Sequence, residues 1–82
     1  MNPISYKIDP IDSPAQTGQA SRIVVRDKLN VYTIGNQHAP LIVVLDSGQI
    51  QIFKDDVVAL DVPYQEGFLT CKANHCEIHL LK

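Results

Sequence analysis

Turn-forming residues punctuate this chain about every eight to twelve residues, and short apolar or alternating stretches fill the intervals between them. Gly or Pro falls in nearly every window long enough to hold a capped helix of two turns. Strands at this spacing are typical of a sandwich or a barrel. We therefore expect an all-β fold that forms a single domain over residues 1–82.

Either alternation or a run of β-branched residues marks each expected strand. These strands cover residues 4–8, 22–26, 30–34, 41–45, 49–53, 58–62, 68–71 and 76–80. The stretch 41–45 (Leu-Ile-Val-Val-Leu) is apolar at every position, so we expect it to be covered on both sides.

Size and charge narrow the possible partners. Of the 82 residues, 45% are apolar and 20% charged, which fits a globular domain rather than a disordered tail. A domain this small buries only about 60–65% of the surface of its unfolded chain, so a partner surface would add to its stability. The net charge of −2 predicts no affinity for nucleic acid or anionic lipid. The sequence shows no signal peptide, and its apolar runs are far shorter than the roughly 20 residues of a membrane helix. We therefore expect a soluble, intracellular protein.

Two cysteines and two histidines near the C-terminus are the densest cluster of possible zinc ligands. A two-residue turn at 73–74 pairs Cys71 with Cys76, so both face one side of a hairpin, while His75 and His79 face the other. Ligands split between two faces cannot converge on one ion, so we expect no metal. The cysteine pair can be bridged with strain, but in a reducing compartment we expect free thiols.

The residues indicate no catalytic centre. His38 stands in a loop with no serine or cysteine placed near it by a recognisable motif. Nothing in the sequence selects a pair of carboxylates for hydrolysis. Gly35, Gly48 and Gly67 are too scattered to form a phosphate-binding loop. We expect no catalytic residue and no cofactor, and a function carried out by docking onto other proteins.

Several short motifs follow one another in an informative order. They are Thr17-Gly18 before Arg22-Ile-Val-Val, then His38-Ala39-Pro40-Leu41, then Ser47-Gly48 before an alternating Gln-Ile-Gln-Ile stretch, and Glu66-Gly67-Phe68-Leu69 before the last hairpin. In order and spacing they resemble the N-terminal β-sandwich of the epsilon subunit of F-type ATP synthases. The likeness covers almost the whole chain, and it implies a small sandwich of two packed, mostly antiparallel sheets with short strands.

Three features depart from that family's pattern. Residues 30–36 lack the acidic residue of the family's glycine-rich loop, and Glu66 replaces the first Gly of a Gly-Gly pair. The chain stops at Lys82, where the sandwich should end, whereas many members continue into two C-terminal helices that can inhibit ATP hydrolysis. The resemblance therefore implies a sandwich-only epsilon subunit, or a piece trimmed to that domain.

The resemblance implies a mechanical role: a non-catalytic central-stalk subunit that docks the gamma subunit onto the c ring and couples proton or sodium flow to ATP synthesis or hydrolysis. Such a subunit lies on the cytoplasmic side of an energy-transducing membrane in a peripheral complex, without inserting into the membrane. The candidate residues facing the c ring are Tyr32, Asn36, Gln37 and His38. The candidate residues facing the gamma subunit are Phe68, Thr70 and His79, on the side of the hairpin opposite Cys71.

Two other hypotheses stay open. The first is an unrelated small β-sandwich that binds proteins in a viral or structural assembly, because this fold recurs without shared function. The second is a small metalloenzyme built on the Cys/His hairpin. Gene neighbourhood separates the first from a stalk subunit, and metal analysis of freshly purified protein tests the second.

Overall fold

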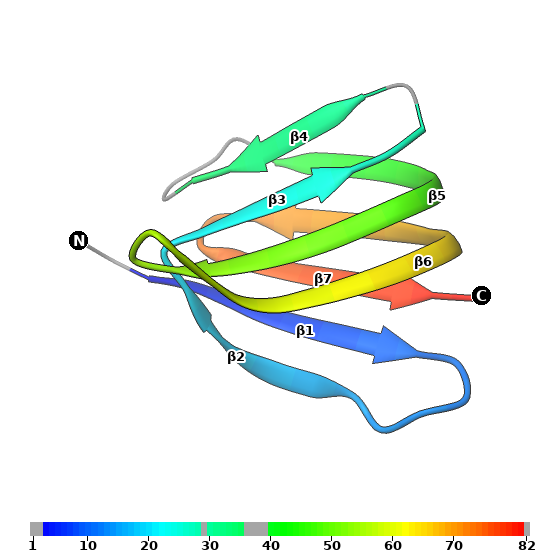
Figure 1. Ribbon diagram of the computed structural model, residues 1–82, viewed down its shortest axis with the longest axis horizontal. Helices are drawn as coiled ribbons and strands as arrows, with labels where there is room; N and C mark the ends of the chain where they lie inside the picture. Colours follow the sequence, from blue (N-terminus) through cyan, green and yellow to red (C-terminus); the bar gives the residue numbers. More distant parts are fainter. Residues whose placement is uncertain (1–2, 29, 36–39, 82) are drawn as a thin grey trace.

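The computed structural model describes residues 3–28, 30–35 and 40–81, and strands are the only regular elements in this part of the chain (Figure 1). The strands are β1 (Ile4–Pro10), β2 (Gln16–Ala20), β3 (Arg22–Arg26), β4 (Val31–Ile34), β5 (Leu41–Lys54), β6 (Val57–Lys72) and β7 (His75–Leu80). The expectation of an all-β fold is confirmed.

Hydrogen bonds join all seven strands into one mixed sheet in the order β2-β1-β7-β6-β5-β3-β4. Among the described strands only the pairing of β1 with β7 is parallel, so the sheet is mostly antiparallel, as expected. Two features differ from the expected pair of short-stranded sheets. The ladder is continuous, and β5 and β6 are 14 and 16 residues long because each joins two predicted strands into one.

The long strands bend, and the burial pattern records the bend. In the first half of β5 the odd positions Val43 and Leu45 are buried, whereas in the second half the even positions Ile50 and Ile52 are buried. A regular strand, bent or straight, turns alternate side chains to opposite faces, so this change of phase requires a residue outside strand geometry, and Ser47 has a φ of 61°. The bend lies at residues 46–47, which are both exposed. Each half of the strand therefore faces the same core from a different layer.

The single sheet thus curls over itself (Figure 1), and the buried side chains between its layers form one hydrophobic core. The expected inward positions of the first strand, Ile4, Tyr6 and Ile8, are all buried. The core cluster comprises Ile4, Tyr6, Ile8, Ala20, Ile23, Val25, Ile34, Val43, Leu45, Ile50, Ile52, Tyr64, Leu69, Cys71, Cys76, Ile78 and Leu80. Side chains from both layers contribute to this core cluster, so the two layers of the one sheet pack against each other as the two sheets of a sandwich do.

A one-residue connection closes the curled sheet. Ser21 alone separates β2, which is at one edge of the sheet, from β3, which is next to the other edge. Its backbone N–H donates to the carbonyl of Phe53 at 2.8 Å, and its hydroxyl lies 3.1 Å from the carbonyl of Asp55. These bonds attach the connection to the β5–β6 hairpin and hold the two layers together.

Two glycines allow the bend. Gly48 lies against the backbone carbonyl of Arg26, and Gly67 lies against that of His79, so closely that a Cβ at either position would overlap the oxygen. The sheet register places Leu45 opposite Gly67, so both glycines lie at the same corner. This contact gives a physical reason for two of the motifs, Ser47-Gly48 and Glu66-Gly67, that carry the family resemblance.

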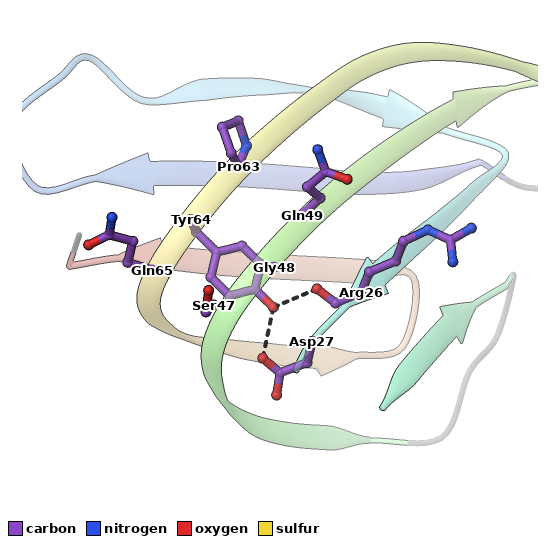
Figure 2. Close-up of a pocket in the computed structure, with 8 residues that line it drawn as sticks. All are labelled: Arg26, Asp27, Ser47, Gly48, Gln49, Pro63, Tyr64 and Gln65. Atoms are coloured by element: carbon purple, nitrogen blue, oxygen red, sulfur yellow. Dashed lines mark hydrogen bonds between the residues drawn. The ribbon is translucent and has the colours of Figure 1, made fainter. Parts of the chain in front are cut away.

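A buried tyrosine reinforces the corner (Figure 2). The hydroxyl of Tyr64 lies 3.0 Å from the carbonyl of Arg26 and 3.1 Å from Oδ1 of Asp27. The same carboxylate oxygen accepts the backbone N–H of Asp46 at 2.7 Å. Burial, together with the hydrogen bond to Asp27, raises the pKa of Tyr64 above its usual range. The open cavity at this corner is lined by these three residues, Arg26, Asp27 and Tyr64, together with Ser47, Gly48, Gln49, Pro63 and Gln65.

The last hairpin has the predicted register. Cys71 pairs with Cys76 and Lys72 with His75 around the turn at 73–74. The two cysteines are buried on the core side, with Cα atoms 4.1 Å apart, and they form a disulfide. The expectation of free thiols is therefore wrong: it rested on the redox compartment, whereas the opposed geometry brings the two sulfur atoms together.

We expect Gly48→Ala to lose more than about 4 kcal/mol of unfolding free energy, or to prevent folding, because the new Cβ must push β5 away from the carbonyl of Arg26. Gly35→Ala is the matched control, since an added Cβ there meets nothing within 4 Å, and it should change stability by less than about 0.5 kcal/mol. Urea unfolding followed by circular dichroism measures both. Equal stability of the two variants would contradict the described corner.

Tyr64→Phe should cost about 1–2 kcal/mol at neutral pH, because it removes the hydroxyl that bonds to Arg26 and Asp27. The raised pKa also makes a prediction about alkali. The stabilisation is complete below the unfolded-state pKa of about 10 and is lost as the pH rises above it, since only the unfolded chain then releases the proton. Free energies of unfolding measured between about pH 8 and pH 11 should show this additional loss of stability in the wild type and not in Tyr64→Phe. Tyr6→Phe, which removes a hydroxyl without a hydrogen bond among the described residues, is the control.

Candidate functional site: an open apolar face beside a histidine–carboxylate cluster

The outer side of the layer formed by β1, β7 and the adjoining halves of β5 and β6 carries the candidate site. Its side chains lie in two rows across the strands. One row runs Ile42, Thr70, Glu77, Lys7, and the other runs Val44, Phe68, His79, Asp9. We call Ile42, Val44, Phe68, Thr70, Glu77 and His79 the open face. Both rows begin apolar on β5 and become polar and charged toward β1.

The apolar end of the open face is exposed to solvent. Ile42 and Val44 are each 80% exposed, and the neighbouring Phe68 is 38% exposed. No other part of the described chain covers this side of β5, so the expectation that residues 41–45 are covered on both sides is wrong within the chain itself. Adjacent large apolar side chains in water mark an interaction surface more often than isolated ones do.

His79 joins the apolar and charged ends of the open face. Its ring stacks on Phe68 with the centroids 4.7 Å apart. Its Nδ1 lies 3.7 Å from Oδ2 of Asp9, and its Nε2 lies 3.4 Å from Oε1 of Glu77. The parallel pairing of β1 with β7 brings Asp9 to this position from the other end of the chain.

A second histidine lies beside the open face. Nε2 of His75 is 3.2 Å from Oε2 of Glu77, and its Nδ1 is 2.6 Å from the hydroxyl of Ser5. Glu77 therefore lies between two imidazoles. The hydrogen bond from His75, with a smaller contribution from His79, lowers the pKa of Glu77.

The candidate residues for the gamma-facing side come together on this surface. Phe68 and His79 are opposite one another across β6 and β7, and Thr70 is the next outward residue of β6. Of the candidates for the ring-facing end, Tyr32 lies half-buried on β4 and packs against the core. Asn36, Gln37 and His38 lie outside the described residues.

Five residues of the two rows were absent from the candidate residues: Ile42, Val44, Glu77, Lys7 and Asp9. The sequence did carry a signal for the first two, because every position of 41–45 is apolar. That signal was interpreted as burial within the chain rather than as a surface for a partner. Nothing in the sequence pairs Asp9 with His79, since a parallel contact between the first and last strands is not visible in local periodicity.

The open face presents apolar contact surface on β5 and β6 with charged residues beside it. Within residues 3–28, 30–35 and 40–81, no group of three or more His, Cys, Asp and Glu side chains is arranged to hold a metal ion. The cysteines face the core and the two histidines face outward, so the predicted separation of the four possible zinc ligands is confirmed.

The described part of the chain has no helix that could span a membrane.

The fold has a counterpart among solved structures. It is similar to a chain in the cryo-EM structure of the central stalk and c ring of the Tetrahymena thermophila mitochondrial ATP synthase, with a TM-score of 0.77 at 20% sequence identity. The likeness covers 96% of this chain and 63% of that chain. No protein-family model and no curated protein sequence matches. At this identity the comparison establishes a shared fold: this chain is built like a component of an ATP synthase central-stalk structure.

Proposed function

We propose that this chain is a non-catalytic rotor subunit of an F-type ATP synthase, of the epsilon type, which docks the gamma subunit onto the c ring. The observation that carries the proposal is the uncovered apolar face, which contains the three residues assigned to gamma docking on sequence grounds. The likeness to a chain of a central-stalk structure supports it.

The open face has the composition of a docking surface. Stable interfaces have an apolar centre from which water is excluded, surrounded by a polar rim. Here Ile42, Val44 and Phe68 supply the apolar part, and Glu77 with Asp9 supplies the charged border.

A rotor subunit has to transmit torque without deforming, and the observed sheet suits that task. The continuous ladder runs through both layers, since β5 and β6 each pass from one layer to the other. Force applied to one layer is therefore transmitted along the backbones of β5 and β6. It does not have to cross a non-covalent interface between two separate sheets. The corner bonds of Tyr64 and Asp27 further resist opening of the bend.

The ring-facing assignment of Tyr32, Asn36, Gln37 and His38 stays part of the proposal, as does a position on the cytoplasmic side of an energy-transducing membrane. In this role the chain acts as an accessory subunit: torque from ion flow passes through it, while ATP chemistry takes place on other subunits. It needs no cofactor and no nucleic acid.

Ile42→Asp and Val44→Asp should each weaken binding to the gamma subunit encoded in the same genome by at least about 30-fold, since a carboxylate would be buried at the apolar centre of the interface. Both side chains are 80% exposed, so folding should be unaffected. Val57→Asp is the matched control, because Val57 is 68% exposed but lies at the β5–β6 hairpin, outside the open face. Isothermal titration calorimetry measures the three dissociation constants.

The wild type decides whether the proposed role stands at all. If it fails to bind this gamma subunit under conditions in which an established epsilon subunit binds its own, the rotor assignment is wrong. Equal weakening by all three variants would place the contact elsewhere than on the open face.

A further inference from the structure

Both ring nitrogens of His79 lie near carboxylate oxygens. Each of its two nitrogens faces a different carboxylate, Asp9 on one side and Glu77 on the other. A neutral imidazole has one N–H and one lone pair, so it can donate to only one of these carboxylates and turns a lone pair toward the other. Only the imidazolium form donates to both.

His75 provides a contrast on the same strand. Its Nε2 can donate to Glu77 while its Nδ1 accepts the hydroxyl proton of Ser5, since that nitrogen is 2.6 Å from the hydroxyl and the alternative acceptor, the carbonyl of Asn74, is 3.3 Å away. The neutral form of His75 therefore satisfies both of its contacts. The neutral form therefore satisfies the contacts of His75 but not those of His79, although both histidines contact Glu77.

A partner that covers the open face must also enclose His79. The ring is stacked on Phe68 and is already only 30% exposed, so apolar contact with Phe68 removes the remaining water from His79. While water reaches the site, solvent screens the mismatch, which is the repulsion between the lone pair of a neutral ring and the carboxylate that it faces. Once water is excluded, the effective dielectric falls and the mismatch becomes costly.

The other charged groups on this surface leave the direction unchanged. Lys7 occupies the cross-strand position next to Glu77, and Lys72 occupies the position next to His75. The cross-strand neighbours of His79 itself are Phe68 on one side and Asp9 on the other. The charges nearest to its ring are thus the two carboxylates.

We propose that docking on the open face takes up a proton at His79, so that binding of the gamma subunit strengthens as the pH falls through the range in which histidine titrates. The inference rests on the proposed function, since it concerns regulation of that same interface. Functionally, acidification of the surrounding compartment would tighten the attachment of this subunit to the stalk.

The test is calorimetric titration of the gamma subunit from the same genome at about pH 6 and about pH 8, in pairs of buffers with different heats of ionisation. The wild type should bind about tenfold more tightly at the lower pH, which by linkage corresponds to an average uptake of about half a proton per complex across these two pH units. His79→Gln, which keeps a polar side chain but cannot be protonated, should lose most of this dependence. His75→Gln is the matched control and should retain it. Thermal unfolding of both variants checks that the sheet is intact.

The outcomes separate the two proposals. Absence of binding at both pH values overturns the rotor assignment, and this inference with it. Binding with the same dissociation constant at both pH values, or a pH dependence that survives in His79→Gln, overturns the proton-uptake inference while the docking role stands. Any titrating groups of the gamma subunit contribute equally to the wild type and the variants, so the difference between them isolates His79.

Discussion

The close approach of Gly48 to the carbonyl of Arg26 is the contact on which the rest of this structure depends. It allows β5 to bend beside β3, and the bend lets one strand serve two layers. Tyr64 and Asp27 then satisfy the polar groups that the bend exposes at the corner. Without this corner the chain would be an open sheet with its core residues divided between two faces.

The bend also determines what remains uncovered. Because the sheet curls in one direction only, its concave side is filled by the core and its convex side faces solvent. Ile42 and Val44 alternate with the buried Val43 and Leu45, so the apolar run 41–45 supplies the core and the open face at once. The open face is thus a direct consequence of an apolar strand at the convex side of a small curled sheet.

Local patterns predicted much of this architecture. The all-β class, the inward positions of the first strand and the register of the last hairpin follow from alternation and from a two-residue turn, which are properties of neighbouring residues. The continuity of β5 and β6 did not follow, because Ser47-Gly48 has the composition of a turn although the structure extends through it. The disulfide was missed for a different reason, since the geometry permitted it and the expected compartment argued against it.

The sequence by itself determined the alternation that makes strands, the turn that pairs Cys71 with Cys76, and the outward direction of Phe68, Thr70 and His79. These features depend on the two-residue period of a strand, which is written in the order of the residues. Only the tertiary structure decided that Asp9 meets His79 and that Ile42 and Val44 stay uncovered. Both depend on where distant strands lie in the curled sheet, and chain order alone does not specify that.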